Sequence, residues 1–231
     1  MTFPYFNQVP NFNYISQFKN AQIGDYVEVK NFFKRVKLRE DIFEDIVYFT
    51  KYKIIGDDRP DNVAHKFYDD SSLDWMVLLA NNIINIQTEW PMQQTAWDSY
   101  LLDKYSNYPS GYTSEYDWLY NGVHHYESIE LKNSNGVTLL PTGTTVKKGY
   151  SYKYYDSFSD SQIETGDIST PVTNWDHEYK IENDKRNIYL LKVEFLGTAL
   201  DDIDEIMKYK KGSSTFISKT LKNADNSRLT T

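Results

Sequence analysis

The chain has four histidines, and these are its residues with the most obvious capacity for metal chemistry. His124 and His125 are adjacent in a segment, residues 124–131, whose apolar side chains alternate as in a strand. Adjacent strand residues point to opposite faces, so we do not expect these two imidazoles to bind one metal ion. His65 falls in a predicted helix and His177 in a predicted strand, and neither has a carboxylate pattern beside it. We therefore predict no metal site and no cofactor.

Paired carboxylates are the second kind of residue that could do chemistry here. A hydrolase of cell-wall glycans needs two of them about 5–9.5 Å apart across a sugar cleft. The pairs Glu127/Glu130 and Glu89/Asp98 could be proposed, but with 33 acidic residues almost any pair can be nominated. The motifs G-x-S-x-G and H-E-x-x-H and the P-loop are also absent from the sequence. We expect no catalytic residues and no enzyme.

The composition favours a protein that binds other proteins. Of the 231 residues 16% are aromatic, with 20 tyrosines against 12 phenylalanines, and tyrosine suits contacts that are buried at one end and wet at the other. Composition bias in an AT-rich genome would raise the tyrosine count as well. The net charge of −8 argues against binding of nucleic acid or of a membrane surface.

Cysteine is absent, which excludes disulfides and thiolate metal sites. The first ten residues have no pattern of an export signal, and no apolar run approaches the ~20 residues of a membrane span. We expect a protein made and used in a cytoplasm, with no membrane and no nucleic-acid partner.

The elements that must position these residues begin with a strand–helix–helix–strand pattern. Residues 52–54 start a strand, residues 56–58 form a turn, and Pro60 suits the first position of a helix. Ser71 or Ser72 can cap a second helix. The apolar face of that helix is Leu73, Met76, Val77 and Ala80. Residues 83–84 are the predicted second strand.

The rest of the chain mixes helix and strand, so we predict an α+β fold. Residues 1–49 comprise an extended aromatic arm, 1–26, and a segment of mixed pattern, and residues 50–86 are the strand–helix–helix–strand module. Residues 87–115 hold a helix and a linker. The predicted apolar face of that helix is Trp97, Tyr100, Leu101 and Tyr105. Residues 116–196 are a mostly antiparallel β region with a hairpin turn at 133–136 and strands at 172–181 and 187–193. Residues 197–231 are a helix, from about 199 to 210, and an extended polar tail.

The strand–helix–helix–strand module resembles LysM modules. The usual Tyr-x-Val start, Gly-Asp-Thr turn, Ile-Ala pair and Leu-x-x-x-Asn end correspond to residues 52–54, 56–58, 63–64 and 78–82. The order of further blocks resembles a narrower group, the LysM-containing baseplate wedge protein of contractile-tailed bacteriophages. Those blocks are Arg59-Pro60, Phe67-Tyr68, residues 73–79, Asn81-Asn82, Trp90-Pro91 and Lys104-Tyr105, with Phe3-Pro4-Tyr5-Phe6 before them and residues 125–127, 171–175, 183–186 and 188–191 after them.

The resemblance implies a structural subunit of the virion tail baseplate, assembled in the host cytoplasm. Its partners would be other wedge subunits and central hub or tube proteins, in a multi-subunit assembly that this chain helps to hold together. From the aromatic arm we predict the interface residues Phe3, Tyr5, Phe6, Phe12 and Tyr14.

Two other functions remain open at this point. The first is a peptidoglycan- or chitin-binding LysM module, and the second, ranked last, is a tail-associated wall hydrolase. A LysM-like groove would be formed by Gly56, Asp57, Asp58, Arg59, Asn81, Asn82 and Ile83. Trp75, Trp90 and Trp97 could stack on sugar rings there, but we favour packing within the protein, because large aromatics dominate core and interface energetics.

Overall fold

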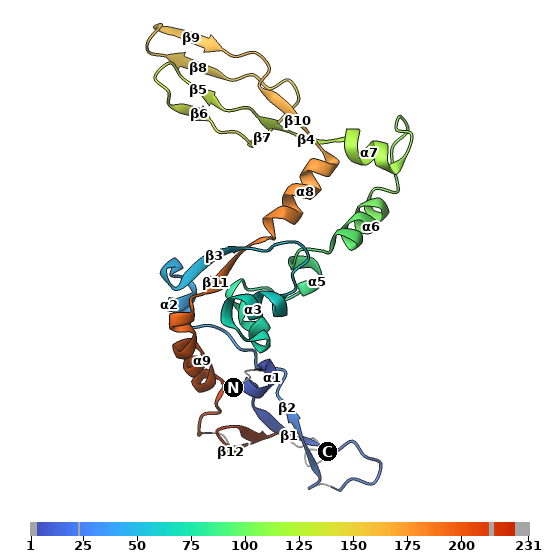
Figure 1. Cartoon of the computed structure of the whole chain (residues 1–231), viewed down its shortest axis with the longest axis vertical. Coiled ribbons are helices and arrows are strands. Elements are labelled where there is room, and N and C mark those ends of the chain that lie inside the picture. Colours follow the sequence, from blue (N-terminus) through green and yellow to red (C-terminus); the bar gives the residue numbers. More distant parts are fainter. Residues whose placement is uncertain (1–3, 23, 213–214, 225–231) are drawn as a thin grey trace. The chain divides into compact units, whose positions relative to one another are not determined.

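The computed structural model describes residues 4–22, 24–212 and 215–224 and divides the chain into two compact units. Unit 1 joins Met1–Trp90 to Arg186–Thr231, and unit 2 is Pro91–Lys185 (Figure 1). Both contain helices and small sheets, which confirms the predicted α+β class. Within the described residues, no helix combines the length and apolarity that crossing a membrane requires.

Unit 1 is built around two antiparallel strands that are far apart in the sequence. Strand β3 (Phe49–Lys53) pairs with β11 (Asn187–Leu191), so that Phe49 lies opposite Leu191. Helices α3 (Pro60–Tyr68) and α4 (Asp74–Ala80), with the 3-10 turn η2 (Ser71–Leu73) between them, follow β3 as predicted.

The predicted second strand at residues 83–84 is wrong. The chain turns there instead: Asn82 has a φ of +52°, and the amide of Ile83 donates to the carbonyl of Leu78 at 2.9 Å. The chain then enters the short helix α5 (Ile86–Glu89). Strand β11 takes the expected place beside β3, because three of its five side chains, Ile188, Leu190 and Leu191, are buried in the core.

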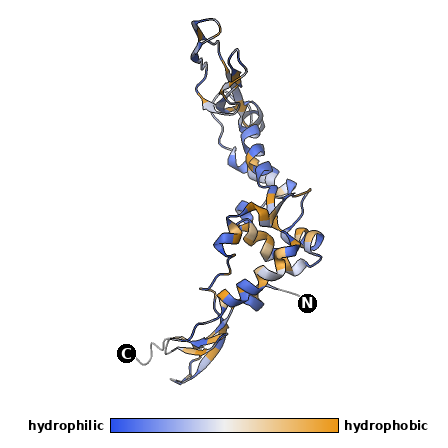
Figure 2. Ribbon diagram, turned by 90° about the vertical axis from the view of Figure 1, so that its left-hand side faces the viewer, coloured by the Kyte–Doolittle hydropathy of each residue, from blue (hydrophilic) through white to orange (hydrophobic). Residues whose placement is uncertain are grey.

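The core of unit 1 lies between this strand pair and the helices. Figure 2 shows the hydrophobic part of the ribbon concentrated there. Both Trp75 and Trp90 are buried in this cluster, and the Trp90 indole N–H donates to the carbonyl of Asp58 at 3.0 Å. The other fully buried members include Val63, Ala64, Met76, Val77, Leu190 and Leu191. These two tryptophans therefore pack within the unit.

Segments near the two ends of the chain form one sheet, where the sequence predicted extended arms. Its order is β12 (Phe216–Ser218), β13 (Leu221–Asn223), β1 (Asn11–Ile15) and β2 (Tyr26–Lys30). Strand β1 is antiparallel to β2 and parallel to β13. Each end forms a local hairpin, and the parallel pairing of β1 with β13 joins the two hairpins across about 200 residues of sequence, which no local pattern could indicate.

Helix α9 (Val193–Met207) completes unit 1 together with three short helices, and it begins earlier than the predicted residue 199. The short helices are α1 (Tyr5–Gln8), α2 (Glu40–Phe43) and the 3-10 helix η1 (Ile46–Tyr48). The Lys34 ammonium donates to the carbonyls of Met207 and Lys208 at 2.7 and 3.0 Å. A cation at this position complements the helix dipole and satisfies the last carbonyls of α9.

Unit 2 has a small core of its own. Trp97 and Leu101 of α6 (Gln94–Lys104), the adjoining Tyr105 and Leu119 of α7 (Glu115–Asn121) are buried together. The predicted helix is confirmed, but Tyr100 on its expected apolar face is exposed. Glu178 of α8 (Asn174–Asp184) accepts from Lys104 Nζ at 2.8 Å and from the Tyr105 hydroxyl at 3.0 Å.

The β part of unit 2 is a three-stranded sheet with two hairpins. The sheet order is β10 (Ser169–Thr173), β4 (Val123–Ser128) and β7 (Thr145–Val146). The hairpins are β5 (Leu131–Lys132) with β6 (Thr138–Leu140), and β8 (Lys153–Asp156) with β9 (Ser161–Glu164). The predicted turn at 133–136 is confirmed, and Gly136 has the positive φ, +77°, that such a turn requires.

The predicted strand at 172–181 is wrong beyond Thr173. Helix α8 begins at Asn174, and the buried face of α8 is Asn174, Glu178 and Glu182, spaced by four residues. Thr173 and Asp176 form a capping box, with the Thr173 hydroxyl accepting from the Asp176 amide at 3.1 Å. The sequence therefore contains a helix start signal that outweighs the apparent alternation.

Candidate interaction surface

A row of aromatic rings in unit 1 runs from the core to the solvent. The ring of Trp75 in α4 lies 6.0 Å from that of Tyr5, Tyr5 lies 5.4 Å from Phe6, and Phe6 lies 5.9 Å from Phe32. All three pairs meet edge to face, the geometry that aromatic rings favour. Trp75 is 7% exposed, Phe6 54% and Phe32 73%. We call these four residues the aromatic row.

An open groove of about 410 Å³ lies beside the aromatic row. Its lining is mainly apolar, with one cation, and consists of Tyr5, Phe32, Arg35, Val36, Trp75, Leu78, Leu79, Ile83 and Ile84. Phe33, the neighbour of Phe32, is 94% exposed. An apolar groove next to exposed phenylalanines is typical of a surface that another protein covers.

The structure divides the predicted interface residues into two pairs. Tyr5 and Phe6 lie in α1 within the aromatic row, and Phe12 and Tyr14 lie on one face of β1 with ring centres 6.0 Å apart. Phe3 lies outside the described residues.

Phe32 and Phe33 were not among the predicted interface residues, because the mixed pattern of their segment indicated neither a helix nor a strand. They occupy an irregular turn after β2, where Phe33 is almost fully exposed and Phe32 is exposed apart from its contact with the ring of Phe6. Two adjacent phenylalanines in a segment without clear periodicity were the available signal.

The first loop of the predicted LysM-like groove, residues 56–59, makes hydrogen bonds and ion pairs within unit 1. Gly56 has a φ of +58°, and its carbonyl accepts from Arg186 Nη1 at 2.6 Å. The carboxylate of Asp58 pairs with Lys66. Arg59 and Asp57 are exposed, and Arg59 pairs with Asp61 at 3.1 Å.

The second predicted groove segment is also used by the fold. The Asn81 amide nitrogen donates to the carbonyls of Val77 and Tyr189, and its oxygen accepts from the Tyr189 amide, each at 2.8 Å. This side chain therefore joins α4 to β11. Asn82 is exposed in the left-handed conformation, and Ile83 packs against the core.

A known protein family matches most of the chain. The model of the base plate wedge protein 53 family covers residues 1–204, which includes all of unit 2 and unit 1 into the last turn of α9. The chain belongs to this phage family. It is thus a structural protein of the baseplate wedge, a component of a multi-subunit assembly in the virion tail. No curated protein matches the chain.

In this wedge protein the four nominated carboxylates have partners of their own. Glu127 accepts from Lys180 at 3.1 Å, and Glu130 pairs with Lys132 at 3.0 Å. Glu89 accepts from two backbone amides, and Asp98 accepts from Gln94 at 2.8 Å. The hydrogen bond with Lys180 lowers the pKa of Glu127, and the hydrogen bond with Lys132 lowers the pKa of Glu130. The two backbone amides lower the pKa of Glu89. A general acid needs the opposite shift.

Proposed function

We propose that this chain holds the wedges of a contractile-tail baseplate together by binding other wedge subunits and central hub proteins through the aromatic row and its groove. The observation that supports this most is the group of exposed phenylalanines, Phe6, Phe32 and Phe33, beside an open apolar groove. A wedge protein functions inside an assembly, where such side chains become buried.

The energetics fit a docking role. Burying a phenylalanine side chain contributes roughly 1.5–3 kcal/mol, and a few such anchors provide most of the binding energy of a typical interface. Tyr5 and Trp75 are already packed behind the exposed rings, so the anchors are held in place before binding. Preorganisation of this kind lowers the entropy cost of association.

The LysM-like part of unit 1 would then act as a protein-docking module. The Asn81 and Asp58 groups that a glycan could use are engaged by Tyr189, Trp90 and Lys66, which favours a protein partner over a sugar. We infer no enzymatic role for the chain and place its assembly in the host cytoplasm.

The test compares two variants of the purified chain during reconstitution with the other tail proteins. The double variant Phe32→Ser with Phe33→Ser should lose stoichiometric complexes in native mass spectrometry while retaining the circular dichroism of the parent. Phe158→Ser is the matched control, because Phe158 is 85% exposed but lies in the β8–β9 hairpin of unit 2. Equal incorporation of both variants would contradict the proposed surface.

A single replacement of Phe6 tests whether this ring also belongs to the binding surface. Tyr5 packs against Trp75, so a change at Tyr5 alters stability as well as binding. Phe6→Ser removes an exposed ring and should weaken incorporation without a change in unfolding midpoint. Saturable binding of the parent chain to purified sacculi, with no binding to tail proteins, would instead support the glycan-binding function.

A further inference from the structure

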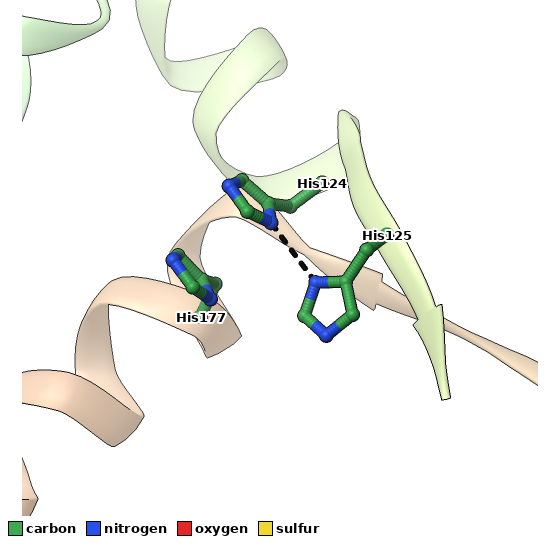
Figure 3. Close-up of side chains that lie close together, drawn as sticks. All are labelled: His124, His125 and His177. Carbon is green, nitrogen blue, oxygen red and sulfur yellow. Dashed lines mark hydrogen bonds between the residues drawn. The ribbon is translucent and has the colours of Figure 1, made fainter. Parts of the chain in front are cut away.

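Three of the four histidines of the chain meet where β10 passes into α8. One nitrogen each from His124, His125 and His177 lies within 4.8 Å of the other two. The Nδ1 atoms of His124 and His125 are 2.9 Å apart, and the rings of His124 and His177 are stacked with centres 3.7 Å apart. Figure 3 shows nitrogens of all three rings facing the same small space.

A β-bulge explains why adjacent histidines can converge. His125 lies opposite Val172 and Val123 lies opposite Thr173, so His124 is an extra residue with no counterpart on β10. Such a bulge redirects side chains and breaks the alternation of faces on which the sequence-based exclusion of a metal depended. His177, predicted on a strand, lies instead in the first turns of α8, four residues after the cap Thr173.

The surroundings of these rings suit metal binding by neutral imidazole. Glu127 lies 3.3 Å from His125 Nε2 and is itself held by Lys180 at 3.1 Å. A carboxylate at Nε2 fixes the proton there and leaves the Nδ1 lone pair of His125 directed at the other rings.

We propose that His124, His125 and His177 bind one divalent transition-metal ion of the zinc type, with Glu127 orienting His125. Tetrahedral coordination at Zn–N distances of 2.0–2.1 Å places ligand nitrogens about 3.3 Å apart. The separations here run from 2.9 Å to at most 4.8 Å. The rings of His124 and His177 are stacked with an angle of 11° between their planes, so metal binding requires one of them to rotate out of the stack.

The donor set selects the class of metal. Imidazole nitrogen suits zinc, copper and nickel, whereas calcium and magnesium require oxygen ligands. Three protein ligands leave a fourth position for water or for a side chain of a neighbouring subunit. Within the chain, the ion would link the start of β4 to the first turns of α8.

The test is a titration of the full, tag-free chain with zinc chloride by isothermal titration calorimetry, and with cobalt chloride by visible absorption. We expect one equivalent of metal per chain and cobalt bands typical of four-coordination. His177→Gln and His124→Gln should each weaken zinc binding by at least about 100-fold, and Glu127→Gln by about 10–100-fold. His65→Gln is the matched control, because it changes the fourth, exposed histidine in α3 of unit 1 and should bind like the parent.

Circular dichroism of each metal-free variant distinguishes loss of a ligand from loss of the fold, and the exposed His124 is the safer of the two ligand changes. Binding of less than one equivalent to the parent would overturn the proposal. So would unchanged affinity in a folded His124→Gln variant, or an equal loss of affinity in His65→Gln.

Discussion

At the scale of single residues, Gly122 has the tightest steric environment of the glycines. A Cβ atom there would lie 2.3 Å from the carbonyl oxygen and from Cε3 of Trp118, and 2.6 Å from the side-chain nitrogen of Asn174. The Gly122 carbonyl also accepts from the Asn174 amide at 2.9 Å. Gly122 therefore allows the end of α7 to meet the start of α8, immediately before the bulged histidines of β4.

We expect Gly122→Ala to lower the free energy of unfolding by about 1–3 kcal/mol, because the added methyl group overpacks against backbone that cannot move away. Urea unfolding followed by tryptophan fluorescence would measure the change. Gly166→Ala is the control in the same unit, since nothing lies within 4 Å of the position that its methyl group would take. A Gly122→Ala variant as stable as the control would show that the α7–α8 junction is looser than described.

The histidines show how far single-residue reasoning reaches. His124 and His125 were correctly assigned to a strand, but the extra residue that brings their rings together depends on the pairing of β4 with β10. No feature of residues 123–128 alone marks the bulge. The prediction that their side chains point to opposite faces was wrong, because side chains alternate strictly only where each residue has a counterpart on the neighbouring strand.

At the scale of elements, the start of α8 is set by the capping box of Thr173 and Asp176. The Thr173 hydroxyl accepts from the Asp176 amide at 3.1 Å and donates to the Asp176 carboxylate at 2.8 Å. These contacts end β10 and begin the helix within one residue. They also place His177 beside the strand that carries the other two histidines.

Replacing Thr173 with alanine should destabilise the protein by about 0.5–2 kcal/mol, because an amide of the first turn loses its acceptor. Thr173→Ser keeps the hydroxyl and should restore most of the loss. The free energy of unfolding in urea measures both. If the serine variant were as unstable as the alanine variant, the methyl group of Thr173 rather than its hydroxyl would be the stabilising feature.

Helix and strand prediction succeeded where the signal is local. The turn at 133–136 carries its own Asn and Gly residues, and α6 carries its own apolar face with Trp97 and Leu101. Helix α7 was missed, although Ser114 caps it by accepting from the Asp117 amide at 3.2 Å. In α8 a polar buried face made the helical period hard to recognise.

At the scale of the whole molecule, unit 2 is inserted between two halves of unit 1. Unit 2 has its own buried cluster around Trp97 and Leu101, and its own polar link from Glu178 to Lys104 and Tyr105. A contiguous segment with a core and satisfied polar groups has the properties of an independent folding unit.

We therefore expect the fragment 91–185 to fold alone, with dispersed amide resonances in NMR spectra and a cooperative thermal transition. Its stability will be modest, because a segment of this size buries a limited fraction of its surface. The complementary control is the chain with residues 91–185 replaced by a short Gly/Ser linker, which retains both β3 and β11. An unfolded fragment would show that unit 2 depends on the rest of the chain.

The sequence alone was sufficient for the α+β class, for the baseplate wedge family that the match over residues 1–204 confirms, and for elements with local signals. Only the tertiary structure decided the pairing of β3 with β11, the sheet formed by segments near the two ends, and the meeting of three histidines. The physical reason is the same in each case. A capping residue or turn glycine acts on its neighbours, whereas a strand partner is chosen by burial and hydrogen bonding across long sequence separations.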